Sequence, residues 1–159
     1  NAAKSYVNLA LAEKKLGEVE SGKDNVEKAL SICESWFSSD NGTYASVLQS
    51  AGLFYAGIKE FDTALDYLQK SLRMYQNTFF EDAMPVINTR IFLGDIYLAN
   101  EDIEKCSEYF KAAWVAYTKI YSEDDALNNL FEDRLRHLYE ESDTGTTYDE
   151  WFQSWKSQK

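Results

Sequence analysis

A pair of small residues separated by twelve positions occurs three times in this chain of 159 residues. The pairs are Gly17 with Ala29, Gly52 with Ala64, and Gly94 with Cys106. Two helices approach closely only where the side chains at their contact are small, because larger ones push the backbones apart. Self-similarity at a fixed spacing is the sequence signature of a repeat architecture. The three pairs therefore predict a repeat architecture, and their small residues would suit a close approach of two helices.

The distance between successive glycines of these pairs defines the repeat, and it is 35 residues and then 42. We call the second distance, from Gly52 to Gly94, the long step. A tyrosine follows the second and third glycines by three residues, and Tyr139 stands in the same place one long step further. In that last unit Arg136 replaces the glycine. We therefore expect three clear units and a degenerate fourth.

This pattern resembles the tetratricopeptide repeat family, whose motif places a large residue and a glycine in the first helix, a tyrosine three residues on, and an alanine twelve residues on in the second helix. The residues that carry the resemblance are Gly17, Ala29, Gly52, Tyr55, Phe61, Ala64, Gly94, Tyr97, Cys106, Phe110 and Ala113. Glu20 stands where the first unit should have an aromatic residue, and the proline that often closes a repeat is absent. The long step is similar to the extended repeats of the kinesin-light-chain-like and Pins-like subgroups.

Helix breakers are scarce, and the apolar residues keep helical spacing. The chain has one proline, Pro85, and seven glycines. Phe61, Ala64, Leu65 and Leu68 follow the three-and-four spacing of a helix face. The predicted helices span 3–21, 24–38, 43–58, 61–78, 85–100, 103–121, 125–141 and 147–157. The fold expected from the resemblance is all-α, a right-handed α-solenoid in which stacked antiparallel helix pairs cover each other's apolar faces.

A single domain is expected over residues 1–159, with units at 3–38, 43–78, 85–121 and 125–157 and the last unit acting as a cap. Thr43 is the predicted N-cap of the third helix. Trp151, Phe152 and Trp155 give the last helix an aromatic face, which we expect to seal the end of the solenoid. The alternative is an exposed motif offered to a partner or to a second copy.

The charge balance constrains the partners of the chain. It has 16 basic and 27 acidic residues, a net charge of −11, which disfavours nucleic acid and anionic membranes because both require cationic contacts. Residues 123–150 alone hold ten acidic and two basic residues, a local balance of −8. One hypothesis is a pocket for a Lys- or Arg-bearing peptide at this end. The alternative is that the acids keep a terminal repeat soluble.

The sequence contains none of the common catalytic motifs. The chain has no Gly-rich phosphate loop, no nucleophile elbow and no zinc-spaced cysteines, so we expect neither an enzyme nor a cofactor. Asp133, His137, Glu140 and Glu141 could share a helix face, but we interpret them as a solvated surface without a metal because nothing supplies a second shell.

Two cysteines bear on the cellular compartment. Cys33 and Cys106 each lie in an apolar helical pattern, which favours reduced, buried thiols. We therefore expect a cytoplasmic or nuclear protein. Because the chain starts within a helical pattern and without Met, a fragment lacking targeting information is expected.

The resemblance also implies which residues line the concave groove formed by the odd-numbered helices. They are Lys14 and Glu18 in the first unit, Gln49 and Leu53 in the second, Asn88, Ile91 and Asp95 in the third, and Asp133, His137 and Glu140 in the fourth. The Lys/Asn/Arg clamp by which some family members grip a terminal carboxylate is not expected, since only Lys14 matches it. The function predicted is binding of a partner's peptide or helical segment. The alternatives are a self-associating scaffold and a regulatory domain of a larger enzyme.

Overall fold

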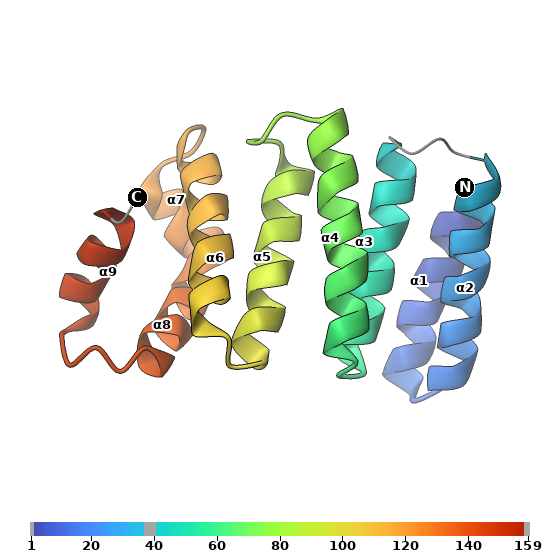
Figure 1. Cartoon of the computed structure of the whole chain (residues 1–159), viewed down its shortest axis with the longest axis horizontal. Coiled ribbons are helices and arrows are strands. Elements are labelled where there is room, and N and C mark those ends of the chain that lie inside the picture. Colours follow the sequence, from blue (N-terminus) through green and yellow to red (C-terminus); the bar gives the residue numbers. More distant parts are fainter. Residues whose placement is uncertain (1, 37–40, 158–159) are drawn as a thin grey trace.

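The computed structural model describes residues 2–36 and 41–157, and Figure 1 shows them as a row of upright helices. The helices are α1 (Ala2–Leu16), α2 (Val19–Trp36), α3 (Gly42–Gly57), α4 (Phe61–Thr78), α5 (Met84–Ala99), α6 (Ile103–Thr118), α7 (Glu123–Ala126), a π-helical turn η1 (Leu127–Phe131), α8 (Glu132–Glu141) and α9 (Tyr148–Ser157). Because α7, η1 and α8 are continuous, the described part of the chain forms eight helical segments and no strand. The predicted all-α solenoid of helix pairs is confirmed.

Side chains cap the N-termini of α3, α6 and α7. The side chain of Asn41, not the predicted Thr43, caps α3 by accepting from the backbone N–H groups of Thr43 and Tyr44. Asp102 caps α6 in the same way through the N–H of Lys105, and Ser122 caps α7 through that of Asp125. The last two residues predicted for the second helix, 37 and 38, lie outside the described residues.

The first repeat differs from its prediction. Gly17 does not lie at a helix contact: it has a φ of +83°, it lies in the turn that ends α1, and a Cβ there would meet no atom within 4 Å. A left-handed residue directly after a helix is a common stop signal. The first helix therefore ends at Leu16 and not near residue 21, and the pairing of Gly17 with Ala29 was wrong.

The close contact of the first repeat is made by Ala10 and Gly22, which are also twelve residues apart. A Cβ on Gly22 would lie 3.3 Å from the carbonyl oxygen of Ala10 and 2.5 Å from the ring of Phe54. Counted from this pair, the first step equals the long step. The equivalent residues are Ala10, Gly52 and Gly94 on the odd helices, and Gly22, Ala64 and Cys106 on the even helices.

A second feature repeats with the same long step. In the second, third and fourth helix pairs an aromatic ring of the first helix packs on one of the second helix, with centroids 5.5 Å apart for Tyr55–Tyr67, 5.5 Å for Tyr97–Tyr109 and 5.6 Å for Tyr139–Trp151. At the equivalent place in the first pair, Asn25 donates a hydrogen bond of 2.8 Å to Glu13. The first repeat therefore replaces an aromatic contact with a polar one.

The aromatic face of α9 is buried. Trp151, Phe152 and Trp155 are 9%, 7% and 3% exposed. Phe152 and Trp155 pack edge-on against Trp114 of α6, and the indole N–H of Trp155 donates to the hydroxyl of Ser107 over 2.8 Å. The final helix thus seals the core of the fourth unit, which favours the capping interpretation over an exposed motif.

Candidate functional site

Polar contacts join α1 to α3 and α3 to α5, the odd helices of the first three pairs in Figure 1. The ammonium of Lys14 on α1 donates to the carbonyl oxygen of Leu53 on α3 over 3.5 Å. The amide of Gln49 on α3 donates to the hydroxyl of Thr89 on α5 over 2.7 Å. These contacts fix the relative positions of successive odd helices, so the face that they form is preorganised.

The third contact of this kind is an ion pair between α5 and α8. The continuous segment α7–η1–α8 is the first helix of the fourth pair, and so we count α8 among the odd helices. The guanidinium of Arg134 donates from Nε to Oδ1 of Asp95 over 2.6 Å and from Nη2 to Oδ2 over 2.9 Å. Its Nη1 donates to the carbonyl oxygen of Leu130 in the π-helical turn over 2.6 Å. The hydrogen bond to Asp95 raises the pKa of Arg134. The bidentate geometry is the stronger form of an Arg–carboxylate pair.

The predicted groove residues on α5 and α8 lie in different environments. Ile91 is buried, at 2% exposed, and so belongs to the core. Asp95 is held by Arg134, while Asp133, His137 and Glu140 are exposed on α8. Among the central helices, Asn88, Gln49 and Leu53 are partly buried. The exposed part of the predicted site therefore lies mainly at the C-terminal end of the odd-helix face.

The corrected repeat changes the assignment in the first unit. With the long step applied throughout, the positions equivalent to Gln49 and Leu53 are Val7 and Leu11, and these two lie on α1. Glu18 lies in the turn between α1 and α2. Lys14 lies on α1 and contacts α3. Leu11 was not among the predicted groove residues, because the first repeat was counted from Gly17.

The exposed acids at the C-terminal end differ in their partners. His137 lies 3.7 Å from Glu141, and Arg136 pairs with Glu132 over 2.9 Å. Within residues 2–36 and 41–157, the carboxylates of Asp133 and Glu140 have no ion pair. The same part of the chain contains no group of three or more His, Cys, Asp or Glu residues arranged to hold a metal ion. It also contains no helix with the length and apolar character needed to cross a bilayer.

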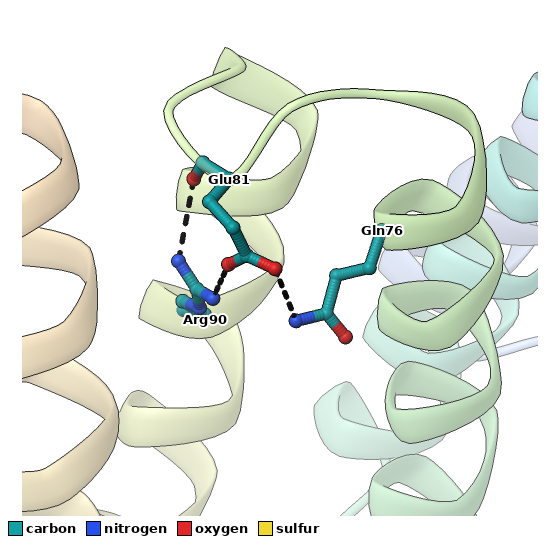
Figure 2. A network of polar contacts seen from close by, with 3 residues as sticks. All are labelled: Gln76, Glu81 and Arg90. Atoms are coloured by element: carbon teal, nitrogen blue, oxygen red, sulfur yellow. Dashed lines mark hydrogen bonds and ion pairs between the residues drawn. The ribbon is translucent and has the colours of Figure 1, made fainter.

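A pocket of about 530 Å³ lies on the opposite, even-helix face. Its lining comes from α4, α5 and α6 and comprises Gln69, Leu72, Gln76, Arg90, Tyr97, Lys105, Glu108, Tyr109 and Ala112. Figure 2 shows that Glu81, from the loop between α4 and α5, bridges two of these residues: its side chain accepts from Gln76 over 2.9 Å and from Arg90. The guanidinium in this pocket is thus already neutralised by the protein.

The internal repeat, with its small and aromatic pairs, agrees with comparison to known sequences. The sequence matches the tetratricopeptide repeat over residues 1–77 and again over residues 87–113. The chain belongs to the tetratricopeptide repeat family. No curated protein matches it significantly. Tetratricopeptide repeats are generally protein–protein interaction modules, and their fold is typically a scaffold without catalytic activity.

Solved structures with a similar fold include those of two proteins. BtubC (BKLC) from P. vanneervenii superposes with a TM-score of 0.75 at 16% identity, over 88% of this chain and 56% of that one. A putative kinesin light chain from Podospora anserina with nearly identical TPR-like repeats gives a TM-score of 0.68 at 14% identity, over 87% of this chain and 72% of that one. A variant of the latter gives 0.69. The chain spans little more than half the length of the first structure, and its fold is of the kinesin-light-chain-like kind.

Proposed function

We propose that the chain binds a peptide or helical segment of a partner protein on its odd-helix face, and that this segment carries Lys or Arg. The observation that carries the proposal is a difference between the centre of that face and its C-terminal end. The central positions are engaged in contacts between repeats, whereas Asp133 and Glu140 on α8 are exposed carboxylates without an ion pair among the described residues.

The electrostatics of this end support a basic ligand. Residues 123–150 carry a balance of −8 out of a total of −11, and opposite charge on a partner would steer its approach and fix its orientation. The three contacts between odd helices hold the face in place before binding, which lowers the entropic cost of association. Apolar contact with the segment would come from Leu53 and, in the first repeat, from Leu11.

A selection from a random peptide library on the immobilised chain tests the proposal. Selected peptides should be enriched in Lys and Arg, and their affinity should fall as salt rises from low to physiological concentration. The double variant Asp133→Lys with Glu140→Lys should lose them. Asp62→Lys with Glu104→Lys is the matched control, because both acids are exposed on the even helices and the net charge changes equally.

Two results would contradict the proposal. One is an affinity that does not depend on salt. The other is an equal loss of binding in both double variants, which would show that only the net charge matters and that the odd-helix face has no special part in binding.

A further inference from the structure

Large exposed apolar side chains gather at one edge of the solenoid. The even helices α2, α4 and α6 all end at the upper edge of the molecule in Figure 1, whereas the turns within each of these helix pairs lie at the lower edge. Among the described residues, six exposed apolar side chains lie at the ends of these helices, in the connections after α4 and α6, or at the first residue of α5: Trp36, Phe79, Phe80, Met84, Ile120 and Tyr121. We call this set the upper edge. It is separate from the odd-helix face.

Two residues of the upper edge are more exposed than any core-packing role would allow. Trp36 is 80% exposed and Phe80 is 86% exposed. Large aromatic side chains in contact with water cost free energy, and exposed apolar patches commonly mark interaction sites. Trp is also among the residues that contribute most to binding at protein interfaces.

The loop that carries Phe80 is held in place by polar contacts. Glu81 turns towards the even-helix face, where Arg90 donates both to its carboxylate and, over 3.3 Å, to its backbone carbonyl, as Figure 2 shows. Gln76 donates to the same carboxylate over 2.9 Å, and the N–H of Ala83 donates to the carbonyl of Phe80 over 3.0 Å. The exposed ring is therefore presented from a fixed backbone, which reduces the entropy lost on binding.

The arrangement recurs one repeat later. Phe79 and Tyr121 are separated by one long step, and each packs on the tyrosine four residues before it, with centroids 5.9 Å apart for Tyr75–Phe79 and 4.5 Å for Tyr117–Tyr121. Each is followed within three residues by consecutive acids, beginning at Glu81 and at Glu123. An aromatic pair followed by acidic residues therefore recurs after α4 and after α6.

The acidic residues beside the upper edge favour some classes of binding partner over others. Residues 76–84 and 118–125 contain five acids and one base, Lys119. Glu81 pairs with Arg90, and Glu123 pairs with Lys156 over 2.7 Å, which leaves three acids without an ion pair among the described residues: Asp82, Asp124 and Asp125. A symmetric dimer through this edge would bring like charges together, and an anionic membrane would be repelled in the same way. A segment that combines apolar and basic residues satisfies both the rings and the carboxylates.

From these observations we infer that the upper edge is a second docking surface, whose partner is a protein segment that carries Leu-type apolar residues interspersed with Lys or Arg. Trp36 and Phe80 are its anchors, and the three acids without an ion pair, Asp82, Asp124 and Asp125, pair with the basic residues of the segment. The inference does not depend on binding at the odd-helix face.

A designed peptide tests it. The probe is an amphipathic helix of about 14 residues, four helical turns, composed of Leu and Lys, and a companion peptide has Glu in place of every Lys. Binding is measured by calorimetry on the wild-type chain, on Trp36→Ser with Phe80→Ser, and on Leu16→Ser. Leu16 is the matched control because it is 75% exposed but ends α1 at the lower edge.

The Leu–Lys peptide should bind, and the double variant should weaken it by at least about tenfold, which corresponds to loss of an interface hot spot. Leu16→Ser should stay within about twofold of wild type, and thermal melts should show all variants folded. Equal affinity for the double variant and wild type, equal binding of the Leu–Glu peptide, or a dimer in light scattering that the double variant dissociates would overturn the inference.

Discussion

Asp95 on α5 accepts two hydrogen bonds from Arg134 on α8, 39 residues further along the chain. This bidentate pair links the third and fourth repeats. The side chains are only about a third exposed, at 35% and 32%, so the pair is better shielded from water than an ordinary surface pair. We expect Arg134→Met to lower the free energy of unfolding by about 1–2 kcal/mol, since it leaves Asp95 without its charged partner.

The control for this variant is Arg136→Met. Arg136 pairs with Glu132 four residues before it, with both side chains about half exposed, and exposed pairs within one helix contribute little to stability because water and salt screen them. Urea denaturation measures both variants. Equal effects of the two substitutions would show that the link between repeats adds nothing beyond a surface ion pair.

The small residues at the helix contacts should resist enlargement. A Cβ at Gly94 would lie 2.4 Å from the ring of Phe110, whereas a Cβ at Gly42 would lie 3.5 Å from the ring of Phe79, an ordinary contact. Gly94→Ala should therefore destabilise the chain by about 1–3 kcal/mol through overpacking. Gly42→Ala, also in a helix, should change stability by less than about 0.5 kcal/mol. A thermal melt of each variant distinguishes the two, and similar melting temperatures would contradict the close contact.

The most buried and the most exposed tryptophan give a second matched comparison. Trp155 is 3% exposed and Trp36 is 80% exposed. Trp155→Ala should cost about 3–5 kcal/mol, because it opens a cavity beside Trp114. Trp36→Ala should cost less than about 0.5 kcal/mol. Unchanged stability of Trp155→Ala would mean that α9 does not cap the core.

The sequence was sufficient to predict the helices and the later repeats, but not the first repeat contact. The predicted pair at Gly17 and Ala29 is displaced by seven residues from Ala10 and Gly22. Seven residues are close to two helical turns, so the displaced Ala29 still lies on the buried face, at 0% exposed. A helical pattern alone cannot separate two positions that share a face.

The candidate site was harder to predict than the fold, because residues from neighbouring repeats decide which of its side chains are paired and which are exposed. Asp95 lies on the predicted helix face, but whether its carboxylate is free to bind a ligand depends on Arg134, which α8 places beside it. The upper edge was missed for another reason: Trp36 ends α2 and Phe80 lies in the loop just after α4, and apolar residues at such places resemble the edge of a core. Only the packing shows that they are exposed.

The thiol of Cys106 provides a pH-dependent test of the repeat core. Burial raises its pKa from the ordinary value of 9.0 to about 12, so the folded chain keeps the thiol neutral while the unfolded chain ionises it from about pH 9. The unfolded state therefore binds fewer protons above that pH, and stability should fall as pH rises from about 9 towards 12. In the wild type at pH 8, a thiol reagent should react with Cys106 only after denaturation.

The variant Cys106→Ala isolates this contribution. Ala64 occupies the equivalent position in the preceding repeat, so alanine fits this type of helix contact. The variant should lose less stability than the wild type between pH 8 and pH 10 in urea denaturation, because its only remaining thiol is Cys33. Identical pH dependence of the two proteins, or rapid reaction of Cys106 in the folded wild type, would show that the thiol is not held in the core as the structure has it.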